Sequence, residues 1–495
     1  MARLRRLTIA AALALTAVAL TPAPAGAGPT QMTVIEDSAT FLGLTDRDPD
    51  RALGEARALG ADAVRMYISW RRASFSPAQY SVPAGFDPGN PDSPGYNWAP
   101  YDRLVRSARA HGLKVIVTAG PAMPYWGSRE PARCPHPVGN KPKLGLSCYW
   151  KPDPALFGKF VGAIAKRYRG KVAFYSIWNE PNLENYLLPQ RIKTKAGTVD
   201  MGGKQLRQLY IAGHRAIRAH DRARANNVLF GETSAISSPR DTLFSALCLK
   251  RSGRPYTGAM KRLQGCSKPR MLPIGGLAVH PYNQNALGSV FSTSKTKASM
   301  SMAYLSRADR LLALAEKYKR VPKRRGIYIT EFGFQSLPAN ALGLGLEQQA
   351  QALNESDRLF FGDKRVKSVA QFELYDVPDP PAEDVFNTGL RQVDGTAKPS
   401  LAAWRLPLVV TRRGANRVEV WGQVRPARGR VRAAVQVARS ARGPFKTIKR
   451  VRTNKAGYFR FELRRGRASR LSYRLRWRSH ASRVAKAGRR IRYRR

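Results

Sequence analysis

The sequence predicts an α/β protein, a (β/α)8 barrel, followed by a small all-β sandwich. Up to about residue 407, short apolar runs that end in polar or turn-forming residues alternate with segments of helical spacing, as in parallel strands joined by helices. After Leu408 the pattern changes to short alternating runs about ten residues apart, separated by Gly, Asn and Arg. A chain of 495 residues has room for both units.

The barrel strands are expected where short apolar runs are bounded by turn residues. The expected strands are 39–43, 63–67, 113–118, 172–177, 227–232, 275–280, 327–331 and 369–376. Helical spacing marks 51–59, 101–111, 155–169 and 206–220, and Gly60 is a C-cap signal for the first of these helices. The segment 71–100 is long and rich in Pro, Gly, Ser and Asn, which is typical of a functional loop.

The first 27 residues are typical of a secretory signal peptide. A basic start with three arginines precedes an apolar run, residues 7–20, and the small residues 25–27 form a cleavage site. A membrane anchor is the alternative, but the run is short and no stop-transfer pattern follows it. We therefore expect a secreted, extracellular protein whose mature chain begins near Gly28 and contains no membrane span.

Four cysteines suit such an oxidising destination, namely Cys134, Cys148, Cys248 and Cys266. Three pairings are conceivable. The spacing favours Cys134–Cys148 and Cys248–Cys266, because each bond then closes a short loop within one connection. The sequence lacks the close Cys or His pairs of a zinc site. We therefore expect two disulfides and no metal site.

The net charge of +53 is extreme and unevenly spread. Residues 408–495 contain 29 Lys and Arg and two acidic residues, and so carry 27 of these charges. This balance favours polyanions such as acidic polysaccharide, a teichoic-acid-type wall polymer, an anionic lipid surface or nucleic acid. The alternative is an arginine-rich proteome whose solvated faces are simply basic. We expect contact with an anionic cell wall or another polyanion through this basic unit, without specific nucleic-acid recognition.

Two of the expected strands end on glutamates in similar motifs. The run 172–177 leads into Trp-Asn-Glu-Pro-Asn, which contains Asn179 and Glu180, and 327–331 ends on Glu331 within Ile-Thr-Glu-Phe-Gly. Catalytic groups of such barrels collect at the carboxyl ends of the strands. The pair of motifs resembles the retaining glycoside hydrolases built on a TIM barrel, the clan that includes cellulases, mannanases, xylanases and β-xylosidases. The resemblance covers roughly residues 35–407.

The resemblance implies hydrolysis of the O-glycosidic bonds of a β-linked polysaccharide or oligosaccharide with retention of configuration. Glu180 would be the acid/base and Glu331 the nucleophile, with carboxyl groups about 5–5.5 Å apart. No metal or organic cofactor is required. Because the proton donor must stay protonated at neutral pH, we expect Glu180 to lie close to Glu331 and away from cations.

The resemblance also implies supporting residues. Arg65 lies inside an otherwise apolar strand, where an unpaired charge is costly. It matches the arginine that keeps the nucleophile ionised, and a salt bridge within the barrel wall is the alternative. Asn179 would hold the sugar 2-hydroxyl. In the His-Pro-Tyr segment that follows the sixth strand, Tyr282 would donate a hydrogen bond to the nucleophile and His280 would line the glycone site.

Three further positions are weighed as site residues. Trp126, in the loop after the third strand, is expected to stack on a sugar ring, and packing beneath the loop is the alternative. Many clan members have a Trp at the end of strand eight as the floor of the −1 sugar site. This chain has Tyr375 or Phe372 there, and we include Tyr375 in the site. Glu232 also ends a strand but lacks a preceding Asn, so we expect no direct role in the chemistry.

The expected organisation is a signal peptide (1–27), a barrel (28–407), a basic β-sandwich (408–488) and a basic tail (489–495). The stretch 454–461 resembles a hairpin of the fibronectin-type or prealbumin-like accessory modules of secreted bacterial enzymes.

Two alternatives to a hydrolase are considered. One is a carbohydrate-binding or wall-attachment protein without turnover, although the intact pair Glu180 and Glu331 argues against it. The other is a transglycosylase, which uses the same residues with a sugar acceptor. The sequence leaves open the glycan and its linkage, endo or exo action, and the oligomeric state.

Overall fold

The computed structural model describes residues 31–74, 79–134, 147–283, 305–337, 343–377, 387–427, 429–490 and 492. The expected signal peptide and most of the expected basic tail lie outside the described residues.

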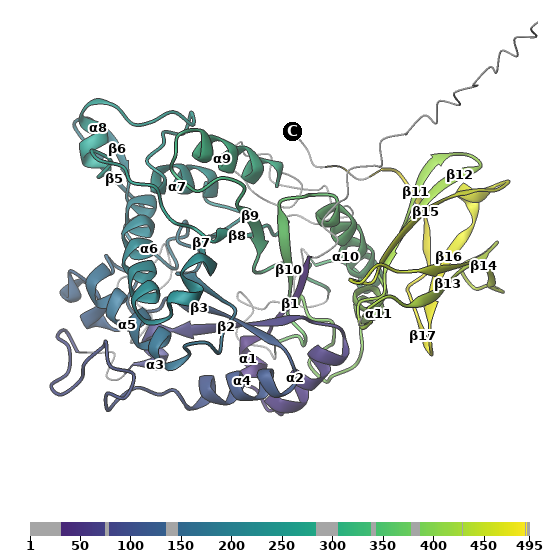
Figure 1. Ribbon diagram of the computed structural model, residues 1–495, viewed down its shortest axis with the longest axis horizontal. Helices are drawn as coiled ribbons and strands as arrows, with labels where there is room; N and C mark the ends of the chain where they lie inside the picture. Colours follow the sequence, from purple (N-terminus) through teal and green to yellow (C-terminus); the bar gives the residue numbers. More distant parts are fainter. Residues whose placement is uncertain are drawn as a thin grey trace, which may run out of the picture.

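The predicted barrel is confirmed: eight parallel strands close into a ring in the order β1-β10-β9-β8-β7-β4-β3-β2 (Figure 1). The strands are β1 Met32–Glu36, β2 Ala63–Ser69, β3 Lys114–Gly120, β4 Phe174–Ile177, β7 Val228–Ser234, β8 Gly276–His280, β9 Gly326–Ile329 and β10 Val366–Phe372. Because all eight run in the same direction, the residues that follow them meet at one end of the barrel.

The first strand is not where the sequence suggested. Residues 39–43 were expected to form it, but β1 is Met32–Glu36, and Ser38–Phe41 is the short helix α1. The reason is local: the Asp37 side chain accepts a hydrogen bond from the Thr40 amide at 3.1 Å, which caps a helix at this point. As a consequence, Glu36 and not a later residue occupies the end of the first strand.

Helices connect the strands and pack around the barrel (Figure 1). The longer ones are α2 Pro49–Ala58, α4 Ala99–Ala110, α5 Pro154–Arg167, α6 Met201–His220, α7 Pro239–Ala246, α9 Ser306–Lys317, α10 Leu346–Phe361 and α11 Pro399–Arg405, and the shorter ones are α3 Trp70–Ala73 and α8 Gly258–Leu263. Asp48, Asp153 and Asp200 cap α2, α5 and α6 with side-chain hydrogen bonds. Within the described ranges, no helix has the length and apolar character needed to cross a membrane.

A hairpin insertion and two disulfides lie in the connections between the barrel strands. A hairpin of β5 Arg191–Thr194 and β6 Gly197–Asp200 precedes α6. Both expected disulfides are present: Cys134 is bonded to Cys148 and Cys248 to Cys266, with Cα–Cα distances of 5.3 and 5.5 Å. Each bond closes its own connection, as the spacing predicted.

The chain after residue 407 is all-β, as predicted, but its two layers belong to one continuous sheet. The strands are β11 Leu408–Gly414, β12 Arg417–Gln423, β13 Arg432–Ala438, β14 Lys446–Arg452, β15 Tyr458–Arg464, β16 Ser472–Trp477, β17 His480–Ala481 and β18 Ala485–Gly488. The order is β14-β13-β16-β18-β11-β12-β15, with β17 paired to β16. Strand β18 pairs with β16 through one half and with β11 through the other, so it joins the two layers.

The C-terminal sheet is docked on helix α10 of the barrel (Figure 1). Strands β11 and β12 alternate: Val410 and Val420 point into the core of the sheet, whereas Val409 and Trp421 pack toward Phe361 of α10. Because both faces of these strands are buried, the two units form a packed interface. Two ion pairs add to this interface. Arg358 of α10 lies 2.8 Å from Glu419 of β12, and Asp357 of α10 lies 2.8 Å from Arg425, in the loop after β12.

Candidate active site

A buried arginine organises the carboxyl end of the barrel. Arg65, on β2, is 1% exposed and its guanidinium faces three carboxylates. One nitrogen lies 2.6 Å from Glu331 and 3.2 Å from Glu36, and the other lies 3.1 Å from Glu232. A guanidinium can donate in a fixed fork to several acceptors, so one side chain holds three strand ends in place.

Asn179 is tied to the same group. Its side-chain oxygen accepts a hydrogen bond of 2.9 Å from Arg65. This contact fixes the amide so that its nitrogen is directed away from Arg65, and Asn179 lines the pocket beside Glu180.

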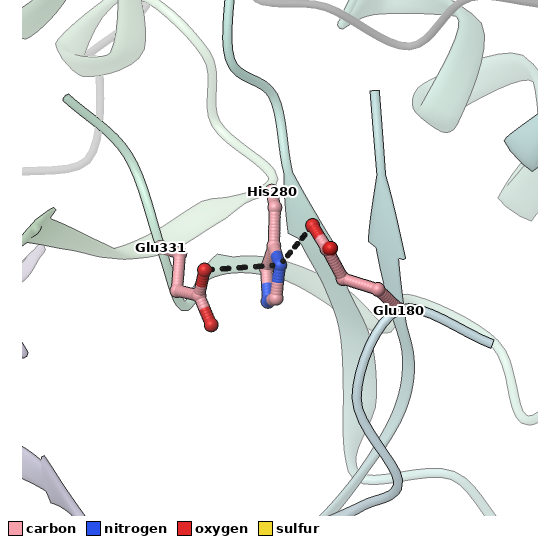
Figure 2. Close-up of side chains that lie close together, drawn as sticks. All are labelled: Glu180, His280 and Glu331. Atoms are coloured by element: carbon pink, nitrogen blue, oxygen red, sulfur yellow. Dashed lines mark hydrogen bonds and ion pairs between the residues drawn. The ribbon is translucent and has the colours of Figure 1, made fainter. Parts of the chain in front are cut away.

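Glu180 and Glu331 lie opposite one another across a histidine. Figure 2 shows the His280 ring between the two carboxyl groups. His280 Nδ1 is 3.1 Å from a Glu180 oxygen and 3.4 Å from a Glu331 oxygen, and one oxygen of each glutamate and this nitrogen all lie within 4.8 Å of one another. Both glutamates line a cavity of about 740 Å³. Tyr282 completes the set, with its hydroxyl 3.4 Å from the same Glu331 oxygen that faces His280.

Glu232 is a buried carboxylate that holds several of these residues in place. It is fully buried and accepts hydrogen bonds from Arg65, from His280 Nε2 at 2.7 Å, from Thr330 at 2.9 Å and from Ser176. The four partners come from β2, β4, β8 and the end of β9, and Glu232 itself lies on β7. Glu232 therefore positions the residues around it, and it does not reach the pocket.

The backbone bends at both strand ends that carry these glutamates. Glu180 and Glu232 have left-handed backbone conformations, with φ of 43° and 46°. The Glu180 amide donates to the Glu232 carbonyl at 2.8 Å, which links the two bends. Non-glycine residues adopt this conformation at an energetic cost, and such sites concentrate where function demands it.

The protonation states follow from burial and charge. Burial raises the pKa of Glu180, and the nearby His280 opposes the rise without cancelling it. Burial lowers the pKa of His280, but Glu331, Glu180 and Glu232 outweigh it and raise the pKa to about 10. Burial raises the pKa of Glu232, but Arg65 and His280 outweigh it and lower the pKa to about 2. The site therefore combines a Glu180 of raised pKa with a cationic His280 and an anionic Glu232 at neutral pH.

The three atoms that meet in Figure 2 also have the spacing of a metal site. The hydrogen bonds argue against such use. With its pKa at about 10, His280 is an imidazolium that donates from both nitrogens, and a metal ligand needs a neutral nitrogen with a free lone pair. The geometry therefore favours hydrogen bonding over metal binding.

Two expectations about His280 and Glu180 are corrected. His280 was expected to line the glycone site, but it is 0% exposed and lies beneath the carboxyl groups, because Glu232 holds it from below. Glu180 was expected to lie away from cations, but the His280 imidazolium is 3.1 Å from it. Burial, and not the absence of cations, raises the pKa of Glu180.

The two aromatic expectations are also corrected. Trp126 is 2% exposed and packs edge-on against Trp70 with ring centres 5.6 Å apart, so it lies beneath the loop and has no face for a sugar. The Tyr375 hydroxyl donates to Glu55 at 2.6 Å, outside the residues that line the pocket. Phe372, the last residue of β10, lines the pocket in its place.

Two acidic residues of the pocket escaped the sequence analysis. Glu36 ends β1 and Glu373 directly follows β10, and both line the cavity. Strand-end position is the signal that could have found them, as it found Glu180 and Glu331. The expected first strand lay after Glu36, and the expected eighth strand ran to residue 376, so neither glutamate stood at an expected strand end.

Comparisons with known proteins support the fold. No protein-family model matches the chain, and no curated protein sequence matches it. A solved structure of a monomeric β-xylosidase from Caulobacter crescentus CB15 is similar at 15% identity and a TM-score of 0.50, over 90% of this chain and 96% of that chain.

Two further solved structures match at lower TM-scores. A glucosidase from Croceicoccus marinus gives 13% identity and 0.49 over 89% of this chain and 94% of that one, and a family 39 glycoside hydrolase from the gut symbiont Bacteroides cellulosilyticus WH2 gives 14% and 0.47 over 88% and 79%. At 15% identity and a TM-score of 0.50, the match to the β-xylosidase shows that this chain shares its fold.

Proposed function

We propose that this protein is a glycosidase that hydrolyses O-glycosidic bonds of a β-linked polysaccharide or oligosaccharide with retention of configuration. The observation that carries the proposal is the pair Glu180 and Glu331. One carboxylate oxygen of each lies within 4.8 Å of the other, and both residues line the same cavity. Retaining enzymes have carboxyl groups about 5–5.5 Å apart, whereas inverting enzymes leave about 6.5–9.5 Å for a water molecule. The spacing supports the retaining mechanism.

The two glutamates have different surroundings, as the two roles require. Glu180 has a raised pKa, which suits a proton donor. Glu331 is held by Arg65 at 2.6 Å and by the Tyr282 hydroxyl, which suits a nucleophile that attacks as a carboxylate. We therefore assign Glu180 as acid/base and Glu331 as nucleophile.

The reaction proceeds in two displacements. Glu180 gives its proton to the glycosidic oxygen while Glu331 attacks the anomeric carbon, so the bond to the leaving sugar breaks and the glycone becomes an ester of Glu331. His280, 3.1 Å away, stabilises the carboxylate that Glu180 has become. Water then gives a proton to Glu180, attacks the anomeric carbon and releases Glu331. Two inversions give net retention.

We further propose that the chain is exported and that its C-terminal sheet contacts an anionic wall polymer. The basis for export is the signal-like segment 1–27. On the sheet, Arg432 pairs directly with Arg452, and Arg450 and Arg476 flank Ala434, all four arginines being exposed. Like charges opposite one another in a sheet are destabilising, so an anionic partner would relieve their repulsion.

The function is tested with the purified full chain on polysaccharides and aryl glycosides of β configuration. Activity is expected, with the β-anomer formed first in proton NMR spectra and with all activity lost in Glu331→Ala. Glu184→Ala, a change of an exposed glutamate, is the matched control and keeps its activity. First release of the α-anomer would overturn the retaining mechanism. Glycan binding without turnover across the panel would favour the non-catalytic alternative, and products longer than the substrate would favour a transglycosylase.

The wall contact is tested by binding to a poly(glycerol phosphate) polymer. Binding is expected to weaken steeply as salt rises. It is also expected to weaken more in Arg432→Gln/Arg450→Gln than in a double Arg→Gln variant elsewhere on the basic surface, such as Arg106→Gln/Arg109→Gln on α4. Equal losses in the two variants would mean that overall charge, and not this face, carries the binding.

A further inference from the structure

The order of the barrel strands divides the pocket into two sides. Going round the ring, Glu180 follows β4 and Glu331 follows β9, and β10 and β1 come next on the side away from Glu180. In the proposed reaction the glycone stays on Glu331 while the leaving sugar carries the proton from Glu180. The glycone therefore extends toward β10 and β1, where Glu36 and Glu373 line the pocket.

Glu373 has an unused hydrogen-bonding atom on this side. It is 4% exposed, and its Oε2 has no hydrogen-bond partner in the described part of the chain. Glu36 lies next to it, because Glu36 pairs in register with Phe372, the residue before Glu373. A buried polar atom without a partner costs about 1–3 kcal/mol, and more if the group is charged. Glu373 therefore brings a buried carboxyl group with one unpaired oxygen to the wall of the pocket, and this points to a ligand.

The cations of the site are already engaged elsewhere. Arg65 and His280 lie against Glu36, Glu180, Glu232 and Glu331. Another buried acid near β10, Asp376, has its own cation in Lys398 at 2.6 Å. Among the described residues, no ion pair involves Glu373. Burial, with Asp37 and Glu36 adding to it, raises the pKa of Glu373 well above its usual value.

We propose that the side of the pocket formed by Glu36 and Glu373 is a subsite for a protonated amine of the glycone, so that the substrate contains amino sugars with free amino groups. An ammonium group has three donors and one positive charge. It would satisfy Glu373 Oε2 and place a cation between two carboxyl groups that otherwise repel each other. The proposal rests on the glycosidase function only for the direction in which the glycone extends.

A divalent metal ion fits this side less well than an amine. Such ions take about six or more oxygen ligands, and each carboxylate near Glu373 is already engaged. Glu36 accepts hydrogen bonds from the Ser38 amide and hydroxyl and from Arg65. Asp37 accepts from the amides of Thr40 and Tyr375. One free oxygen on Glu373 suits a single donor group and not a coordination sphere.

Because of the protein's overall positive charge, a binding test can separate an amine subsite in the pocket from general electrostatic attraction. A molecule with a net charge of +53 repels polycations at long range, so a preference for a cationic glycan has to arise inside the pocket. Calorimetry would compare β-1,4-linked glucosamine oligosaccharides with cello-oligosaccharides of equal length. All binding measurements use the Glu180→Gln background, which prevents turnover, so the two glycans meet a pocket of the same charge.

We expect the glucosamine oligosaccharide to bind at least about tenfold more tightly than its hydroxyl counterpart, the gain of a hydrogen bond to a charged group. Glu373→Gln should abolish this preference, and Glu184→Gln, the same change at an exposed position, should leave it intact. Equal binding of the two glycans, absence of binding by both, or a preference that survives Glu373→Gln would overturn the proposal. Turnover of a neutral glycan by the wild type without amine preference would overturn this inference alone. Amine preference without turnover would overturn the glycosidase function alone.

Discussion

Replacing Glu232 by glutamine removes one buried charge and keeps the shape of the side chain. In the wild type this carboxylate is 3.1 Å from Arg65 and 2.7 Å from His280 Nε2, and both partners are almost fully buried. In Glu232→Gln the two cations remain without their shared counter-ion. The two proposed catalytic glutamates would then have to compensate for them.

The magnitude follows from the pKa of Glu232. Its pKa falls from 4.5 to about 2 on folding, and this shift corresponds to about 3 kcal/mol of stability. Because the folded-state pKa is the lower one, the stabilisation is present above about pH 4.5 and is lost as the pH falls toward 2. Breaking a buried ion pair from one side costs about 3–5 kcal/mol, which agrees with this value.

Denaturant unfolding of the two proteins between pH 2 and pH 8 measures the effect. At pH 7 we expect Glu232→Gln to lower the free energy of unfolding by about 3–5 kcal/mol. The difference from the wild type should shrink by about 3 kcal/mol as the pH falls from 5 to 2. The matched control is Glu347→Gln, whose partner Arg483 is 3.0 Å away and whose side chain is 69% exposed. An exposed pair is worth about 0–1 kcal/mol.

The activity of Glu232→Gln gives a second readout. Loss of the hydrogen bond to His280 should disturb the ring that contacts both proposed catalytic carboxyl groups, and small displacements of such groups cost about 100-fold in rate. The reasoning would be refuted if Glu232→Gln and Glu347→Gln cost the same at pH 7, or if the difference from the wild type did not change with pH.

Three further predictions concern the reaction, a disulfide and the interface. Glu180→Gln should lower kcat/KM for unactivated glycosides by about 100-fold or more, and much less for aryl glycosides with acidic leaving groups; equal losses for both would exclude a proton donor at this position. Replacing Cys248 and Cys266 by alanine opens a loop of 18 residues and should cost about 3 kcal/mol in denaturant unfolding; an unchanged midpoint would contradict this. Gly60→Ala places a Cβ 2.2 Å from the Arg425 carbonyl at a φ of 96°, so limited proteolysis should cut between the barrel and the sheet faster than in the wild type, with Gly85→Ala as the open-space control.

The sequence located most of the fold because its signals are local. Apolar runs and their turn residues marked seven of the eight barrel strands to within a few residues. The remaining strand, which is the first of the barrel, was misplaced. The Asp37 side chain caps a helix there, so the apolar segment expected to form the strand begins with helix α1. The cysteine spacing gave both disulfides, and the change of pattern at Leu408 coincides with the start of β11.

The aromatic residues of the site were predicted less well. The sequence places Trp126 in the loop after the third strand, but it does not show whether the ring packs against the core or faces the pocket. The structure buries it against Trp70. At the end of β10, Phe372 and Glu373 line the pocket, whereas the Tyr375 hydroxyl bonds to Glu55 outside it, and the sequence pattern does not distinguish these positions.

The sequence by itself determined that Arg65 lies on a barrel strand and that Glu180 and Glu331 lie at the ends of two others, because the apolar runs and turn residues around each one mark these positions. Only the tertiary structure decided what surrounds them. Closure of the ring brings β1 beside β10 and thereby Glu36 beside Glu373, although these residues are far apart in the chain. The physical reason is that the spacing of apolar residues reports burial and local hydrogen bonding, whereas the distance between two strand ends depends on the order and register in which the sheet closes.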